Sequence, residues 1–164
     1  MFCRILSVLV ALAAVLAGAG PSRAASPWVR SDMVEARLIA SVRATGDLAS
    51  VPLGLHLRLD PGWKTYWRSP GDAGQPPAID WAGSANLASA SLSWPAPERF
   101  TLFGLETFGY ADEVVLPIAA APTRPGEPLD LRAGVDLLVC SDICVPRRVD
   151  LAFALPAGPP APSD

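Results

Sequence analysis

The chain has 164 residues, of which 51% are hydrophobic, and its formal net charge is −3. Its basic residues are scattered along the sequence, so no phosphate-binding face is expected and nucleic acid is not an expected partner. The chain holds one histidine, and a histidine without a nearby nucleophile supports no hydrolase.

The first 24 residues have the features of a secretory signal peptide. Arg4 supplies a positive start, residues 5–17 form an apolar run, and residues 22–24 offer the small side chains that a signal peptidase reads. The apolar run is shorter than the roughly 20 residues of a spanning helix, so we expect export and cleavage after Ala24 rather than an uncleaved anchor. Cleavage removes Cys3 and leaves two cysteines, an even number that fits a compartment in which disulfides persist.

The rest of the chain alternates apolar and polar residues with a period of two, which is the pattern of half-buried β-strands. In LGLHLRLD four leucines alternate with polar or small residues, and the turn sequence Asp60-Pro61-Gly62 ends the run. No segment shows a sustained period of 3.6 with helix caps. The runs that alternate are residues 34–42, 53–60, 87–94, 113–118, 129–139 and 149–155.

Proline and glycine clusters such as SPGDAGQPP and APTRPGEP separate these runs, and prolines fit turns and edge strands better than sheet centres. We therefore predict an all-β fold, an immunoglobulin-like antiparallel β-sandwich, over residues 25–156. The segment 157–164 is predicted to be a proline-rich linker or a frayed end, because it has too few apolar side chains to pack.

The aromatic block GWKTYWRSPGDAG follows the second run. Trp63, Tyr66 and Trp67 could form a binding surface, but the sequence favours buried aromatic residues at a strand end, because each ring buries a large apolar area. His56 falls on the polar side of its run, where we expect a solvent-facing histidine.

Cys140 and Cys144 lie four positions apart in VDLLVCSDICVP, between two apolar runs. In a continuous strand their Cα atoms would be about 13 Å apart, far more than the roughly 5.5 to 6 Å of a disulfide. A bond between them therefore requires a turn at Ser141-Asp142-Ile143, where serine and aspartate favour one. The pair would then sit at the tip of a hairpin, where a partner protein can reach it.

Three roles are open for this pair. A structural disulfide would be a weak staple, since closing a loop of about five residues contributes about 2 kcal/mol in the chain-entropy model. A metal site lacks ligands, because zinc prefers about four and the mature chain adds only His56, Met33 and carboxylates to the thiols. Redox exchange needs a thiolate, a second thiol and access, but this spacing is not the C-x-x-C of thioredoxin folds and is by itself a weak motif.

Three blocks in order, HLRLDPGWKTYWRSPGDAGQPPAIDW, FGYADEVVLPI and LLVCSDICVP, resemble the N-terminal periplasmic domain of the DsbD family of thiol:disulfide interchange proteins. The likeness is greatest to the ScsB-like branch, which is associated with copper-stress operons, and it covers roughly residues 30–156. The better-known DsbD domains separate their cysteines by more residues. The resemblance implies an immunoglobulin-like protein-disulfide reductase domain in the periplasm. We expect no cofactor, and no metal because the ligands fall short.

The resemblance also implies roles for the cysteines. Cys144 would form the mixed disulfide with partners, and Cys140 would resolve it. Electrons would come from a membrane-embedded donor, in the same polypeptide or in a separate one. They would pass to oxidised periplasmic thioredoxin-fold proteins, such as disulfide isomerases or proteins of cytochrome c maturation. The alternative from a different class is a non-catalytic periplasmic binding or copper-handling domain with a structural disulfide.

The segment FGLETFGYADE falls where the family has a cap loop whose aromatic residue shields the cysteines. By this resemblance Phe103, Phe108 and Tyr110 are the candidate shields, and we favour Phe108. Gly104 and Gly109 interrupt the segment as a strand, so we expect a loop that can fold over the sulfurs and lift away.

Overall fold

In the computed structural model, residues 24–102 and 104–163 are described, so all of the predicted signal peptide except Ala24 lies outside the described residues. The described chain forms eleven β-strands. It contains no helix that is long and apolar enough to span a membrane. The strands are β1 (Val29–Ser31), β2 (Val34–Ala40), β3 (Val51–Leu59), β4 (Lys64–Gly71), β5 (Ala78–Asp80), β6 (Leu87–Leu92), β7 (Glu98–Leu102), β8 (Leu105–Ala111), β9 (Glu113–Pro122), β10 (Leu129–Cys140) and β11 (Cys144–Leu155).

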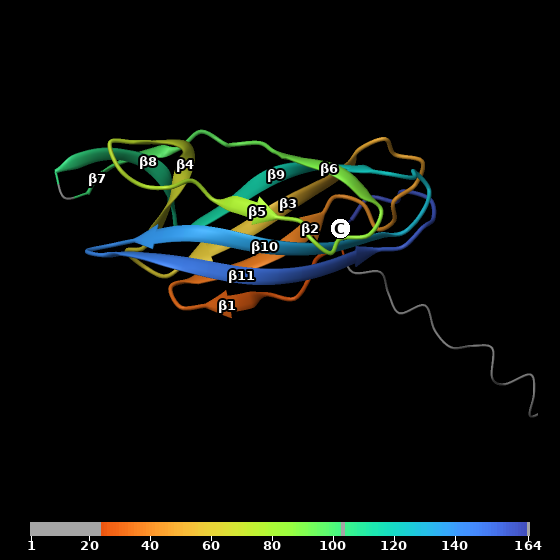
Figure 1. The fold of residues 1–164 in the computed structure, drawn as a ribbon, viewed down its shortest axis with the longest axis horizontal. Coiled ribbons are helices and arrows are strands. Elements are labelled where there is room, and N and C mark those ends of the chain that lie inside the picture. The colour runs from red at the N-terminus through yellow and green to blue at the C-terminus, as the bar shows by residue number, and fades with distance from the viewer. Residues whose placement is uncertain (1–23, 103, 164) are drawn as a thin grey trace, which may run out of the picture.

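The strands form two antiparallel sheets that pack as a sandwich (Figure 1). The five-stranded sheet has the order β1-β2-β3-β9-β6. The six-stranded sheet has the order β11-β10-β4-β8-β7, and β5 pairs separately with β10. The long β10–β11 hairpin reaches its turn at the same end of the molecule as β4, β7 and β8 (Figure 1). This all-β, immunoglobulin-like sandwich confirms the predicted fold class.

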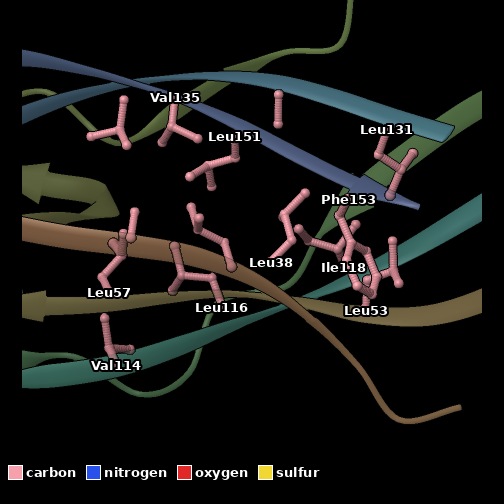
Figure 2. Packing of buried hydrophobic residues seen from close by; sticks show 14 of the residues in the cluster. Leu38, Leu53, Leu57, Val114, Leu116, Ile118, Leu131, Val135, Leu151 and Phe153 are labelled. Carbon is pink, nitrogen blue, oxygen red and sulfur yellow. The ribbon is translucent and has the colours of Figure 1, made fainter. Parts of the chain in front are cut away.

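The core lies between the two sheets (Figure 2). Alternate residues of β2, β3 and β9, such as Leu38 and Leu116, face alternate residues of β10 and β11, such as Leu131 and Val135, and all four are 0% exposed. Each large apolar side chain that leaves water stabilises the fold by about 1.5 to 3 kcal/mol. The period-two alternation therefore predicted these strands correctly, because it reports which side of each strand is buried.

Five strands, β1, β4, β5, β7 and β8, were not predicted by alternation. β1 and β5 have three residues each, too few to show a period. β4 changes its exposure pattern along its length and pairs with β8 through a register shift. Irregular pairing of this kind removes the strict alternation on which the prediction relies.

The expected cap loop is a β-hairpin, β7–β8, with Gly104 in its turn. The prediction of a loop was wrong because Gly109 does not interrupt β8. Gly109 pairs with Tyr66 of β4, and a Cβ atom at this position would lie 2.0 Å from the carbonyl oxygen of Thr65. The glycine therefore permits β4 and β8 to approach closely and supports the strand.

The proline-rich tail, which is predicted to be a linker or frayed end, lies beside the loop after β2. The Gly46 N–H donates a hydrogen bond to the Gly158 carbonyl, and the Ser163 N–H donates one to the Ser41 carbonyl, both at 2.9 Å. Backbone groups make these contacts, so the shortage of apolar side chains in the tail does not prevent them.

His56 is buried and not solvent-facing, which corrects the expectation from its place on the polar side of β3. It is 8% exposed, and its ring lies 4.7 Å from the ring of Trp28, which covers it. Arg37 Nε donates to His56 Nδ1 at 3.1 Å, and His56 Nε2 contacts the Glu113 carboxylate. The segment before β1 thus covers the outer face of the sheet, which the alternation within β3 does not reveal.

Candidate functional site

The β10–β11 hairpin brings the two cysteines together. Cys140 is the last residue of β10, Cys144 is the first residue of β11, and the two are paired across the ladder. Their Cα atoms are 4.1 Å apart and their sulfurs form a disulfide. The Ser141 N–H donates a hydrogen bond to the Ile143 carbonyl at 2.9 Å, which closes the turn. The predicted turn and the predicted hairpin tip are both confirmed.

The two cysteines differ in their access to solvent. Cys140 is 0% exposed, whereas Cys144 is exposed. The neighbouring Ile143 is 61% exposed. Because thiol–disulfide exchange requires an attacking sulfur to reach the sulfur that it attacks, a partner protein can approach this pair at Cys144.

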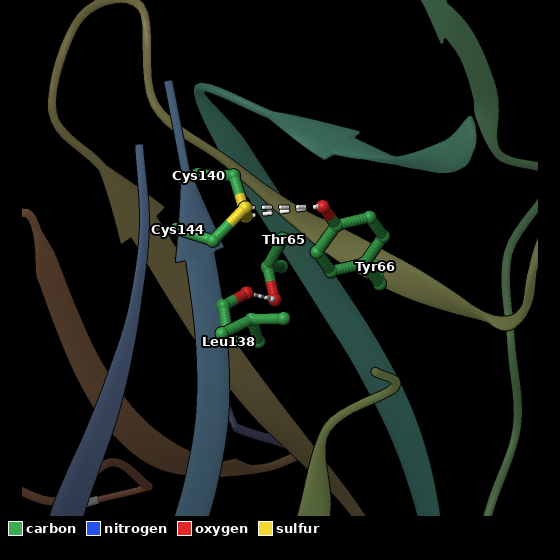
Figure 3. Close-up of a disulfide and its surroundings, with 5 residues drawn as sticks. All are labelled: Thr65, Tyr66, Leu138, Cys140 and Cys144. Carbon is green, nitrogen blue, oxygen red and sulfur yellow. Dashed lines mark hydrogen bonds between the residues drawn. A yellow bond between two sulfur atoms is a disulfide. The ribbon is translucent and has the colours of Figure 1, made fainter. Parts of the chain in front are cut away.

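A tyrosine hydroxyl lies against the disulfide (Figure 3). Tyr66 Oη donates a hydrogen bond to Cys140 Sγ at 3.0 Å and lies 3.7 Å from Cys144 Sγ. The ring is 1% exposed and packs with Cys140 and Leu138. Burial raises the pKa of the Tyr66 hydroxyl above its ordinary value. The sequence favours a buried, packed Tyr66 over a binding surface and does not link it to the cysteines, because a separation of 74 residues from Cys140 carries no signal of their contact.

Strand β4 positions Tyr66 at the sulfurs because it joins β10 at the cysteine itself. Lys64 is the residue of β4 that pairs with Cys140. Thr65 is 0% exposed, and its hydroxyl donates to the Leu138 carbonyl at 3.1 Å, which ties β4 to β10 next to this point (Figure 3). Side chains two residues apart in a strand share a face, so Tyr66 lies on the same side as Lys64 and Cys140.

Three aromatic residues are the sequence-based candidates for a shield over the sulfurs. Phe103 lies outside the described residues. Tyr110 is 5% exposed in the main core cluster, and its hydroxyl donates to the Pro95 carbonyl at 2.9 Å. Phe108 is half-buried in β8. The shielding role of all three stays a prediction.

The strand register places another ring, that of Phe100, on the face that carries Tyr66. Tyr66 pairs with Gly109, and Phe100 pairs with Thr107 two residues earlier in β8. These four residues share one face of the sheet, and Phe108 lies on the other. Sequence analysis did not single out Phe100, because the faces of β7 and β8 follow from a pairing that it did not predict.

The residues around the pair give no sign of a metal centre. Among the residues that the structure describes, no group of three or more His, Cys, Asp or Glu side chains is placed to hold a metal ion. His56 and Met33, the other ligand types considered from sequence, have other contacts. His56 bonds Arg37 and Glu113, and the sulfur of Met33 accepts a hydrogen bond from Arg147 at 3.5 Å.

Comparison with known families gives one match. The profile of the family described as "Thiol:disulfide interchange protein DsbD, N-terminal" matches residues 32–156. No curated protein matches the chain.

Several solved structures are also similar to this chain. The N-terminal periplasmic domain of ScsB from Proteus mirabilis is 34% identical with a TM-score of 0.65, and the match covers 83% of this chain and 54% of that one. This chain therefore spans about half the length of that structure. The reduced DsbD N-terminal domain of Neisseria meningitidis is 18% identical with a TM-score of 0.40, covering 77% and 90% of the two chains. The complex of the DsbD and PilB N-terminal domains from Neisseria meningitidis matches at 19% identity and a TM-score of 0.37, covering 77% and 89%.

Proposed function

Because the chain belongs to the family of DsbD N-terminal domains, we propose that it is a periplasmic thiol:disulfide exchange module that works through Cys140 and Cys144. The observation that carries the proposal is the hairpin tip, which holds two cysteines at bonding distance and exposes one of them. A protein-disulfide reductase needs these two features, an accessible sulfur and a second sulfur that can resolve the mixed disulfide.

The proposed reduction of a partner has two steps. The Cys144 thiolate attacks one sulfur of the partner's disulfide, a bond forms between the two sulfurs, and the partner's other sulfur leaves as a thiolate. The Cys140 thiolate then attacks Cys144 Sγ, and the partner's remaining sulfur leaves with the electron pair. In total, two electrons pass to the partner and the Cys140–Cys144 disulfide forms. The two cysteines release their protons to water, and the partner's two thiolates take up protons from water.

The exposure of Cys144 and the burial of Cys140 support this assignment of roles. The attacking thiol must reach a sulfur on another protein, whereas the resolving thiol needs only to reach its neighbour across the hairpin. The proposed partners are oxidised periplasmic thioredoxin-fold proteins. A membrane-embedded dithiol donor, in the same polypeptide or in a separate one, is proposed to reduce the pair again. We also propose residues 1–24 as a signal peptide, 25–156 as the exchange domain and 157–164 as a tail or linker.

The reduction potential of the Cys140–Cys144 couple tests the proposal. The pair is equilibrated with thiol–disulfide buffers, and its redox state is read by alkylation and mass spectrometry. We expect a potential between about −270 and −120 mV, the range of thioredoxin-like exchange proteins. The control is the Cys144→Ser variant, which cannot form the intramolecular bond and should show no transition. A potential below about −300 mV, typical of a structural disulfide, would favour the non-catalytic or copper-handling alternative.

A further inference from the structure

The hydroxyl of Tyr66 has no part in the exchange as proposed above, yet it is bonded to one of the reacting sulfurs. Its oxygen lies 3.0 Å from Cys140 Sγ and donates a hydrogen bond to it. The same oxygen lies 3.7 Å from Cys144 Sγ. The tyrosine therefore contacts the buried sulfur more closely than the exposed one.

We propose that Tyr66 is a catalytic hydrogen-bond donor that stabilises the thiolate of Cys140 whenever the Cys140–Cys144 bond forms or breaks. This inference rests on the proposed function, since it concerns the same pair. A disulfide sulfur is neutral, whereas the Cys140 thiolate carries a full negative charge. A hydrogen bond to a charged acceptor is roughly twice as strong as one to a neutral acceptor, so the contact with Tyr66 strengthens as the charge develops.

The first step affected is the reduction of the pair by a dithiol donor. A donor thiolate attacks the exposed Cys144 Sγ and bonds to it, the Cys140–Cys144 bond breaks, and Cys140 leaves as a thiolate with the electron pair. The donor's second thiolate then attacks the donor sulfur of the mixed disulfide, and Cys144 leaves. Two electrons reach the pair, and the donor becomes a disulfide. A leaving thiol with a lower pKa leaves faster, so the bond from Tyr66 accelerates this reduction.

The second step affected is the resolution of the mixed disulfide with an oxidised partner. Here Cys140 must lose its proton before it attacks Cys144 Sγ, and the bond from Tyr66 raises the fraction of Cys140 that is thiolate. The gain is partly offset, because nucleophilicity falls as the pKa of a thiol falls. The Brønsted coefficient is about 0.4 to 0.5, so lowering the pKa of Cys140 by one unit speeds its attack by about threefold at any pH below that pKa.

The surroundings of Tyr66 suit this role. Burial raises the pKa of its hydroxyl, so the hydroxyl keeps the proton that it donates. The ring is 1% exposed, and the backbone of Gly74 lies directly against it, since a Cβ atom on Gly74 would clash with Tyr66 Cε1. A donor held in place before the reaction needs no reorganisation when charge develops on the sulfur.

Other charged residues neighbour the pair in the strand register or in the turn, and the test must separate them from Tyr66. On β4, Lys64 pairs with Cys140, and its Nζ lies 4.8 Å from the centre of the Phe100 ring. Asp142 is exposed in the turn between the cysteines, and Glu98 pairs with Gly109 on the face of Tyr66. Replacing the hydroxyl of Tyr66 leaves all three of these charges in place.

The experiment isolates the resolution step with a small chromogenic disulfide, Ellman's reagent, in place of a partner protein. In a chain with Cys3→Ser, the reduced Cys144 attacks the reagent and releases one thionitrobenzoate. The Cys140 thiolate then attacks Cys144 Sγ and releases the second. Stopped-flow absorbance measures the second release from pH 6 to 11, and its dependence on pH gives the pKa of Cys140 at the moment of attack.

Tyr66→Phe removes only the hydroxyl and should raise this pKa by about one to two units, a tenfold to hundredfold loss of thiolate at neutral pH. The second release should then be about three to ten times slower at neutral pH and faster than wild type at a pH above both pKa values. This crossing of the two profiles is a signature that a purely structural role of the ring would not produce.

Tyr110→Phe is the matched control, because it removes the other buried tyrosine hydroxyl, which bonds the Pro95 carbonyl and not a sulfur. Its profile should match that of wild type. The proposal is overturned if Tyr66→Phe melts like wild type and the pH dependence of its second release is unshifted. It is also overturned if Tyr110→Phe shifts that pH dependence by the same amount.

A second variant covers the case in which Tyr66→Phe does not fold. The chain has two tyrosines, so a fluorinated tyrosine incorporated in the Tyr110→Phe background replaces Tyr66 alone. Its more acidic hydroxyl should lower the pKa of Cys140, and an unchanged or raised value overturns the proposal. The assay needs no protein partner, so a chain that fails to reduce thioredoxin-fold proteins could still show the shift in the pKa of Cys140. The proposed function and the proposed role of Tyr66 therefore fail separately.

Discussion

At the scale of residues, the two cysteines share one bond but have different surroundings. Cys140 is 0% exposed and accepts a hydrogen bond from Tyr66. Cys144 begins β11 and is exposed. The difference arises because Cys140 pairs with β4 on one side and β11 on the other, whereas among the described strands Cys144 pairs only with β10. We therefore expect the two sulfurs to perform different steps of the exchange.

Serine substitution of each cysteine tests this division of roles. In Cys140→Ser the exposed Cys144 can attack an oxidised thioredoxin-fold protein, but no thiol remains to resolve the mixed disulfide. We expect the trapped complex on a non-reducing gel, and its loss on reduction. Cys144→Ser is the matched variant and should trap little, because its remaining thiol is buried. A complex that forms with Cys144→Ser and not with Cys140→Ser would reverse the assignment.

At the scale of elements, the β7–β8 hairpin determines which aromatic rings can shield the sulfurs. Its pairing with β4 places Phe100 on the face of Tyr66 and Phe108 on the opposite face. Two hydrogen bonds between Asp72 and Glu106, at 2.9 and 3.0 Å, hold the hairpin to the segment that follows β4. A shield in this hairpin would move with a paired strand and not as a free loop.

The alkylation rate of the reduced pair by iodoacetamide tests the shield. If Phe108 is the shield, Phe108→Ala should speed alkylation of Cys140 or Cys144 and leave the melting temperature nearly unchanged. If Phe108 only packs, the variant should lose about 3 to 5 kcal/mol of stability, as large core truncations do, with no change in alkylation. Phe100→Ala is the comparison from the other face of the hairpin. Faster alkylation in that variant alone would assign the shield to Phe100.

At the scale of the whole molecule, we expect the fold not to depend on the disulfide. The bond closes a loop within one hairpin, between residues separated by four positions. The main core lies between the sheets and draws side chains from β2, β3, β9, β10 and β11. A short loop restricts the unfolded chain only slightly, so we expect the core and not the bridge to provide most of the stability.

The double variant Cys140→Ser, Cys144→Ser tests this. We expect it to keep its β-sheet circular dichroism and a cooperative melt, with a free energy of unfolding lower by about 2 kcal/mol. Leu131→Ala, which truncates a side chain that is 0% exposed, is the comparison and should cost about 2 to 5 kcal/mol. A double variant that is unfolded at 25 °C would show that the disulfide is a structural staple.

The sequence by itself determined the strands that enclose the core and the turn between the cysteines. Side chains alternate along any strand, so a buried strand such as Val34–Ala40 shows its inner face in the order of its own residues. A turn at Ser141-Asp142-Ile143 followed as the condition for a bond between the cysteines, because two cysteines four positions apart cannot bond across an extended chain. Both features are local, so a single stretch of sequence contains the information.

Only the tertiary structure decided what surrounds those features. Tyr66 reaches a sulfur 74 positions away along the chain, and Trp28 covers His56 from a segment outside its strand. The burial of Cys140 depends on where β4 joins β10. These contacts arise when distant segments pack, and no pattern within one segment encodes which residue of another will meet it. The sequence therefore located the cysteine pair, while packing determined which sulfur is exposed and which hydroxyl bonds the other.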